Sequence, residues 1–173
     1  HVSYEFKDKA GRIILTRQSD DNQISYDTYH VYDNYGNLRM VLPPMAADYF
    51  FDEGEWSETA PVLDQYAYIY HYDAFGRCIY KKLPGCDPIY TVYDAADHPI
   101  FTQDGKQRDR NEWSFSIPDA FGRAILTGVC TNVLDYASNP LDTIVVYADW
   151  ANAENELKGY QLEGVTLNFP IIQ

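Results

Sequence analysis

Short runs of aromatic and β-branched residues recur along the first 130 residues, and turn-forming residues separate them in pairs. The stretch Ala67–Leu83, AYIYHYDAFGRCIYKKL, shows this pattern most fully. At its centre, Asp73 and Gly76 occupy the first and fourth positions of a type I turn. Gly accepts the positive φ that closes a hairpin with a bulge, and the flanking residues favour a pleated surface. The stretch therefore predicts a β-hairpin.

The same unit occurs five times. Its turn aspartates stand at positions 8, 33, 73, 94 and 119, with spacings of 25, 40, 21 and 25 residues. A period in the twenties indicates an array of supersecondary units, and the long spacing contains an insertion. The predicted turns are Asp8-Gly11, Asp33-Gly36, Asp73-Gly76, Asp94-Asp97 and Asp119-Gly122. Asp97 replaces glycine in the fourth copy, and Asp tolerates the left-handed conformation that the position requires.

The residues around each turn predict how the strands are covered. Residues two and four before the turn Asp share one strand face and are nearly all apolar. Tyr32, Tyr72 and Tyr93 directly precede their turn Asp and lie on the opposite face, where we expect a stacked row whose hydroxyls reach polar partners. The residue after the turn glycine is Arg12, Arg77 or Arg123 in three copies. We expect it to pair with the turn Asp, within or between repeats, rather than to bind anions.

These patterns predict an all-β protein of antiparallel β-hairpin repeats that form a curved, twisted sheet strip. Residues 1–130 contain the repeats, and residues 43–65 form an insertion in which Met45–Phe51 predicts a short helix turn. Residues 131–173 lack the Asp-x-x-Gly turn. They predict an appended hairpin of the same domain, with strands at Thr143–Trp150 and Tyr160–Phe169.

Composition narrows the classes of partner. The chain has 173 residues, 16 of them Tyr, and a net charge of −13. This charge argues against nucleic acid and anionic membrane surfaces, because phosphate binding requires clustered Lys and Arg. No apolar run is long enough to span a membrane, and no signal peptide pattern is present. We expect the chain to be a piece of a longer protein.

Three cysteines, Cys78, Cys86 and Cys130, leave at least one thiol outside any disulfide. Cys78 and Cys86 are close enough in the chain to pair across a short loop. The alternative is that all three are small, partly buried thiols.

The residues do not predict an enzyme, a metal site or a cofactor. His30, His71 and His98 stand at different repeat positions and lack a metal-ligand spacing. The Asp33 turn lacks the acid that would complete a calcium loop. No phosphate loop, nucleophile elbow or Rossmann pattern is present.

A binding surface is the alternative to a purely structural role. Aromatic residues beside carboxylates suit sugars, and such residues gather in and after the insertion, around residues 45–72. The candidate contacts for a glycan or a protein partner are Trp56, Tyr66, Tyr68, Tyr70 and Trp113.

The repeated Tyr-Asp-x-x-Gly-Arg unit resembles the YD repeats of the Rhs family, which also occur in toxin complexes and teneurins. Val41–Pro44, Lys81–Gly85 and Asp119–Gly128 are similar to Rhs-type repeat proteins of Bacteroidetes. The resemblance implies a segment of a secreted or surface protein that builds the wall of a β-shell. Such a shell encloses or displays a C-terminal effector. It implies neighbouring repeats of the same parent chain as partners. The family's autoproteolytic core motif and toxin domain have no match here.

Overall fold

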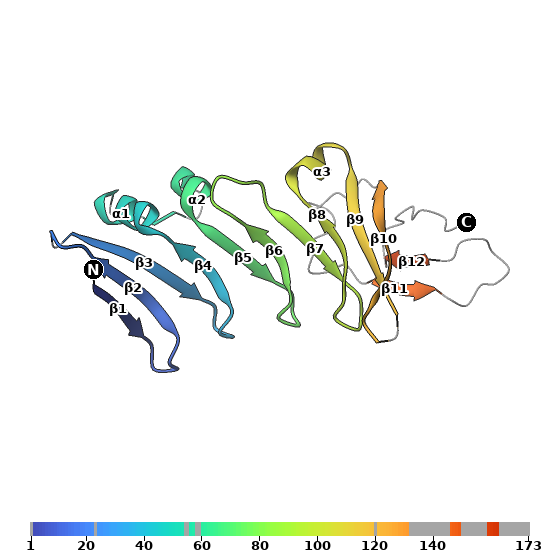
Figure 1. Cartoon of the computed structure of the whole chain (residues 1–173), viewed down its shortest axis with the longest axis horizontal. Helices are drawn as coiled ribbons and strands as arrows, with labels where there is room; N and C mark the ends of the chain where they lie inside the picture. Colours follow the sequence, from blue (N-terminus) through green and yellow to red (C-terminus); the bar gives the residue numbers. More distant parts are fainter. Residues whose placement is uncertain are drawn as a thin grey trace. The chain divides into compact units, whose positions relative to one another are not determined.

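The computed structural model describes residues 2–22, 24–53, 56–57, 60–119, 121–131, 146–149 and 159–162. Their main element is a ten-stranded antiparallel sheet in which β1 to β10 follow one another in chain order (Figure 1). This confirms the predicted all-β class. The ten strands are β1 Val2–Lys7, β2 Ile13–Ser19, β3 Ser25–Tyr32, β4 Leu38–Leu42, β5 Tyr68–Tyr72, β6 Cys78–Lys82, β7 Ile89–Tyr93, β8 Pro99–Gln103, β9 Glu112–Pro118 and β10 Ala124–Thr131.

Each predicted turn joins two consecutive strands. We number the resulting hairpins 1 to 5, from β1–β2 to β9–β10. In hairpins 1, 2 and 4 the register shifts by one residue just before the turn Asp, as between Phe6 and Lys7. Hairpin 5 has the same bulge, because Pro118 pairs with Ala124 whereas Ile117 pairs with Leu126. These bulges fit the positive φ at the fourth turn position.

The chain divides into two compact units, each of which is described by itself. The first comprises His1–His71 and Lys81–Asp87, and the second comprises Tyr72–Tyr80 and Pro88–Gln173.

In the first unit, the insertion forms two helices rather than the single short turn expected from the sequence. Helix α1 spans Pro44–Glu53 and helix α2 spans Pro61–Tyr66. Proline is favoured at the start of a helix, where its missing N–H leaves no bond unmade. Buried residues from both helices pack with the end of β4 around a shared apolar core. The core residues are Leu42, Ala46, Val62, Leu63 and Ala67.

A buried lysine holds the end of α2. Lys82 Nζ donates to the carbonyl oxygen of Asp64 at 2.6 Å and lies 3.0 Å from the Asp64 carboxylate. The Gly85 N–H donates to the same carbonyl. The last carbonyls of a helix have no partner within the helix, so these two donors complete α2 and tie it to hairpin 3.

In the second unit, one face of the sheet carries the large buried side chains. The register places Val92, Phe101 and Phe115 across from one another in β7, β8 and β9. The Phe115 ring lies directly over Gly128, where a Cβ would meet it at 2.8 Å. Helix α3, Gly105–Asp109, was not expected from the sequence. Its start is fixed by a reciprocal capping box between Asp104 and Gln107.

The predicted C-terminal strands are described only in part. Strand β11, Val146–Asp149, pairs antiparallel with β12, Gly159–Leu162, in a sheet of their own. The remaining residues of both predicted strands lie outside the described residues. No helix in the described part of the chain is long and apolar enough to cross a membrane. Cys78 and Cys86, which both belong to the described residues, do not form a disulfide.

The helix core gives a first prediction. We expect Leu63→Ala to lower the free energy of unfolding by about 2–5 kcal/mol, because Leu63 is fully buried and its truncation leaves a cavity. Urea denaturation followed by circular dichroism measures the change. Met45→Ala, on the exposed side of α1, is the matched control and should stay within about 0.5 kcal/mol. Equal effects of the two variants would contradict the core assignment.

Candidate functional site

The structure places one hydrogen-bond arrangement at all five predicted turns. In the first turn, the Gly11 N–H donates to the Asp8 carbonyl, and the Asp8 N–H donates to the Arg12 carbonyl. The Asp8 Oδ1 accepts from the N–H groups of Ala10 and Arg12. The equivalent bonds recur in the other four copies. Asp therefore closes each turn with its own side chain, and Gly or Asp97 supplies the positive φ.

The second carboxylate oxygen holds the side chain that follows the turn. In each copy, Oδ2 of the turn Asp contacts the residue four positions later. We call this residue the clamp residue. The five clamp residues are Arg12, Asn37, Arg77, His98 and Arg123. Charge-assisted bonds such as Arg77 Nε to Asp73 Oδ2, at 2.6 Å, are about twice as strong as neutral ones.

These bonds favour the ionised carboxylate. Hydrogen bonds from the Arg12 backbone and, after them, from its guanidinium hold the pKa of Asp8 below its usual value. The Arg123 guanidinium and backbone do the same for the pKa of Asp119. At Asp33 and Asp73 burial is the largest single influence and opposes the shift, but the hydrogen bonds of the turn together still lower the pKa.

Clamp residues also reach the next hairpin. We call the contact between one hairpin's turn and the next hairpin a joint. In joint 1–2, the Arg12 guanidinium lies over the Tyr32 ring at 4.9 Å, and the Tyr32 hydroxyl donates to the Ile13 carbonyl at 3.1 Å. Arg12 also lies against the second turn, because a Cβ on Gly36 would be 3.2 Å from its Nη1.

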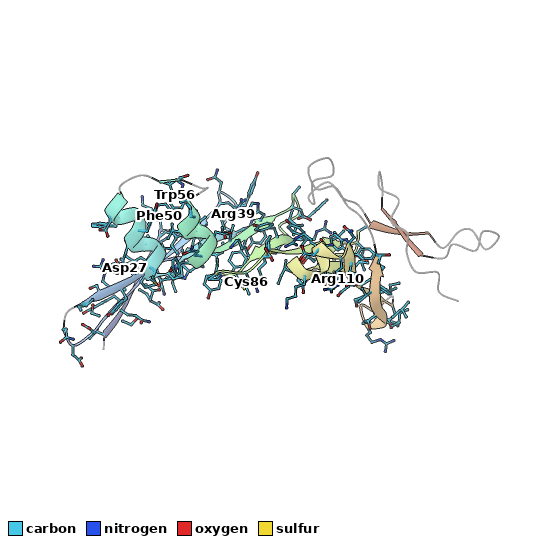
Figure 2. All side chains as sticks on the ribbon, turned by 90° about the horizontal axis from the view of Figure 1, so that it is seen from above. Asp27, Arg39, Phe50, Trp56, Cys86 and Arg110 are labelled. Atoms are coloured by element: carbon cyan, nitrogen blue, oxygen red, sulfur yellow. The ribbon has the colours of Figure 1, made fainter. Side chains whose placement is uncertain are left out.

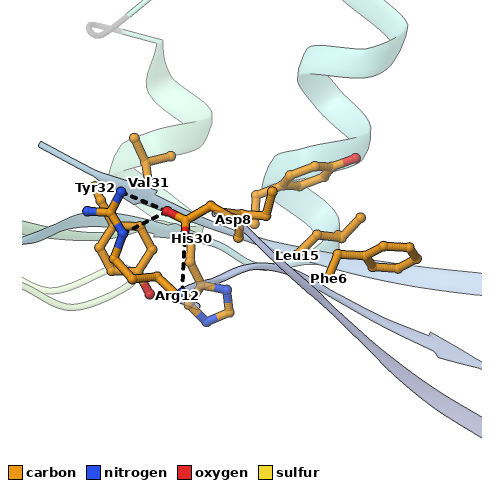
Figure 3. Close-up of a pocket in the computed structure, with 9 residues that line it drawn as sticks. Phe6, Asp8, Arg12, Leu15, His30, Val31 and Tyr32 are labelled. Atoms are coloured by element: carbon orange, nitrogen blue, oxygen red, sulfur yellow. Dashed lines mark hydrogen bonds and ion pairs between the residues drawn. The ribbon is translucent and has the colours of Figure 1, made fainter. Parts of the chain in front are cut away.

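Side chains, rather than main-chain bonds, connect the two hairpins at joint 1–2, where the strands separate. The β2–β3 ladder runs from Ser19↔Ser25 to Leu15↔Tyr29 and stops before the turns. Beyond it lies an open hollow of about 530 Å³ whose lining includes Phe6, Arg12 and His30 (Figure 3). In the middle of the ladder, Arg17 forms a two-bond fork with its cross-strand partner Asp27. That fork holds the pKa of Asp27 low.

Joint 3–4 repeats this arrangement with more contacts. The Arg77 guanidinium lies between the rings of Phe75 and Tyr93, at 5.0 and 5.1 Å. Its Nη1 donates to the Asp94 carbonyl at 2.8 Å and to Asp97 Oδ1 at 3.0 Å. The aspartate that replaces glycine in the fourth turn is therefore paired with the clamp residue of the third hairpin.

Tyrosine supplies the second link of this joint. The Tyr93 hydroxyl donates to the Cys78 carbonyl at 3.0 Å, the same bond that Tyr32 makes to Ile13. Burial raises the pKa of Tyr93. The sequence predicted a tyrosine row with bonded hydroxyls, and these two bonds show how it connects consecutive hairpins.

The candidate ligand-contact residues differ in their burial, and they belong to both units. Trp113 is only 2% exposed, inside the second unit, and its burial argues against contact with a ligand at the surface. Tyr66 packs against the α1–α2 core, and Tyr68 and Tyr70 are partly buried. Trp56 alone of the five is well exposed, at 54%, and its ring contacts Phe50 at 4.7 Å (Figure 2).

Sequence reasoning missed one further turn of the same kind. Between β2 and β3, the Asp20 Oδ1 accepts from the N–H groups of Asn22 and Ile24. The signal was an Asp followed by turn-forming residues, but the residue four positions later is Ile and not a clamp. Among the described residues, no cluster of three or more His, Cys, Asp or Glu side chains is placed to hold a metal ion.

This geometry defines an array of antiparallel hairpins linked through their aspartate turns. No protein-family profile and no curated protein matches the chain. Solved structures match at the level of the fold. The TcdB2-TccC3-TEV crystal structure is 16% identical, with a TM-score of 0.56 over 77% of this chain. That of TcdB2-TccC3 is also 16% identical, with a TM-score of 0.55 over 75%.

A third similar structure is the Photorhabdus luminescens Tc holotoxin pore with a mutated TccC3. It is 15% identical to this chain, with a TM-score of 0.55 over 77% of it. This chain spans only 6% of the length of each of the three matched chains.

The turn carboxylates give a second prediction. Because the pKa values of Asp8, Asp33, Asp73 and Asp119 are lowered in the folded chain, their stabilising effect is complete above the unfolded value of 3.8 and is lost as pH falls below it. We expect urea denaturation to show a loss of stability between about pH 4 and pH 2.

Asp73→Asn tests the source of this loss. It should cost about 1–3 kcal/mol at pH 7, because a charged acceptor for Arg77 is removed, and it should flatten the acid profile. Asp109→Asn, on the exposed end of α3, is the control. An unchanged acid profile in Asp73→Asn would show that the turns are not responsible.

Proposed function

We propose that this chain is a non-enzymatic structural segment of a longer Rhs-type repeat protein, in which its hairpins build part of a β-shell wall. The fold likeness to TcdB2-TccC3 chains supports this, because toxin complexes are among the settings of the repeats that the sequence resembles. On this proposal the parent protein is secreted or displayed at a surface, and its shell encloses or presents an effector.

The last clamp residue carries the proposal. Arg123 makes the same in-turn bonds as Arg77, to the Asp four positions earlier and to the preceding aromatic ring. Yet the Arg123 side chain is 74% exposed, whereas that of Arg77 is 18% exposed. No turn among the described residues covers it. Strands β1 and β10 likewise each have one sheet neighbour among the described strands. We infer that both ends receive further hairpins of the parent chain.

A comparison of two arginine variants tests the assignment. In this chain, Arg77→Ala should lower the free energy of unfolding by about 1–3 kcal/mol, because the buried Asp73 carboxylate loses its charged partner. Arg123→Ala should cost less than about 1 kcal/mol, since its pair is exposed. Electron cryomicroscopy of the full parent protein should then show residues 2–131 within a continuous wall, with another turn against Arg123. A separate lobe with both edges in solvent would overturn the proposal.

A glycan-binding surface is the second candidate, and Trp56 favours it. Its exposed ring rests on Phe50, and the neighbouring Phe51 is 87% exposed. Aromatic faces held in this way suit the apolar faces of sugar rings.

A glycan array with the purified chain tests this candidate. We expect specific binding that falls at least about tenfold in Trp56→Ala, corresponding to loss of about 1.4 kcal/mol of contact. Tyr35→Ala removes a still more exposed aromatic from the second turn and should leave binding unchanged. Absent binding, or binding insensitive to Trp56→Ala, would eliminate the candidate.

A further inference from the structure

In joints 1–2 and 3–4, one tyrosine meets two groups of the preceding hairpin at once. The Tyr32 ring lies 4.9 Å from the Arg12 guanidinium, and its hydroxyl donates to the Ile13 carbonyl. Tyr93 repeats both contacts on hairpin 3, with its ring 5.1 Å from the guanidinium. In both joints the accepting carbonyl belongs to the residue directly after the clamp, and the tyrosine directly precedes the next turn Asp.

The two contacts together favour tyrosine over other residues at this position. The face of an aromatic ring attracts a guanidinium, and a phenol hydroxyl supplies the hydrogen bond to the carbonyl. Phenylalanine offers only the first contact, and proline offers neither. Hairpin 5 has Pro118 at this position, and the clamp before it is His98, whose imidazole approaches the fifth turn at Gly122.

Arg123 supplies the clamp side of another joint of the tyrosine kind. Its Nε donates to Asp119 Oδ2 at 2.7 Å, and its guanidinium lies 5.4 Å from the Phe121 ring of its own turn, as in hairpin 3. The next residue is Ala124, whose carbonyl has the chain position of the two acceptors described above. The Arg123 side chain is 74% exposed, so a ring from outside the described residues can reach it.

The first hairpin of a second copy does not fit this end. At the position of the tyrosine it carries Lys7, which forms an ion pair with Glu5 at 3.4 Å. In a head-to-tail contact between two copies, Lys7 of one copy would take the place of the ring beside Arg123 of the other. Like charges in this position repel and so exclude the wrong partner.

From this geometry we propose that hairpin 5 ends in a tyrosine-selective docking surface, formed by the Arg123 guanidinium and the Ala124 carbonyl. Its partner is a further hairpin of the parent protein that carries Tyr directly before its turn Asp. The ring of that tyrosine lies over the guanidinium, and its hydroxyl donates to the Ala124 carbonyl. This inference rests on the proposed function and adds the chemistry by which the next hairpin is recognised.

Rebuilding the joint within the chain tests the preference for tyrosine. His98→Arg together with Pro118→Tyr gives joint 4–5 the pair found in joints 1–2 and 3–4. In urea denaturation, the folding equilibrium constant of the double variant should exceed the product of the two single effects by at least about twofold. Pro118→Phe in the same background keeps the ring without the hydroxyl and should show a smaller excess. Additive effects, or an equal excess with Phe, would overturn the preference.

Self-association tests the docking surface itself. Lys7→Tyr gives hairpin 1 the residue that Arg123 selects, so copies of this variant should associate head to tail. By sedimentation velocity we expect a dissociation constant at least about tenfold below that of wild type, and Arg123→Ala should cancel the gain. Lys7→Leu is the matched control, because it removes the same charge without adding the ring or the hydroxyl. If Lys7→Tyr associates no more strongly than Lys7→Leu, the proposal is wrong.

Electron cryomicroscopy of the parent protein separates this inference from the proposed function. We expect a tyrosine ring over Arg123. A hairpin packed there with no tyrosine before its turn would contradict the docking chemistry and leave the proposed wall intact. A separate lobe would contradict the wall, whatever the two variant tests show.

Discussion

The turn aspartate performs two separate tasks with its two carboxylate oxygens, and the contacts between hairpins depend on both. Its Oδ1 satisfies two backbone N–H groups and so sets the turn. Its Oδ2 fixes the direction of the clamp side chain. A long side chain such as Arg77 would otherwise lose conformational entropy on reaching the next hairpin, and the bond to Asp73 restricts it in advance. The turn thus determines both where one hairpin ends and where the next one attaches.

Main-chain pairing alone does not hold consecutive hairpins together. Between β8 and β9 the ladder has two paired positions, and between β2 and β3 it ends before the turns. Near the turns, side chains make the connection. The clamp residue lies over or against the next turn, and the tyrosine hydroxyl of the next hairpin donates to a backbone carbonyl of the preceding hairpin. Repeat proteins gain much of their stability from such nearest-neighbour interfaces. The clamp residues differ among the copies, as Arg77 and His98 illustrate, so the contacts differ from joint to joint.

The sequence predicted those features whose causes are local. An Asp three residues before a Gly, between strand-like runs, is enough to specify a hairpin, and the residue after that Gly is near enough to bond the Asp. Tyr32 and Tyr93 were expected to bond through their hydroxyls, but their acceptors, Ile13 and Cys78, belong to the preceding hairpin and required the strand order. The approach of the His98 imidazole to the fifth turn at Gly122 was not predictable for the same reason.

Tertiary packing decided the features that the sequence did not predict. Helices α1 and α2 form because Leu63 and Ala46 bury apolar surface against Leu42, although a helix as short as α2 is marginal alone. Pro44 and Pro61 at the helix starts were the available signals. Trp113 was a candidate contact residue because its strand neighbours were unknown. The register sets it opposite Cys130 on a covered face, where it serves the core.

A double-mutant cycle on Arg77 and Tyr93 measures the central interaction most directly. The free energy of unfolding is determined for wild type, Arg77→Gln, Tyr93→Leu and the double variant. If the clamp residue links one turn to the next hairpin, the two changes are not additive, and the coupling energy is at least about 0.5 kcal/mol. Additive effects would mean that the guanidinium and the ring are neighbours without an energetic link, and would contradict this account of how the hairpins are joined.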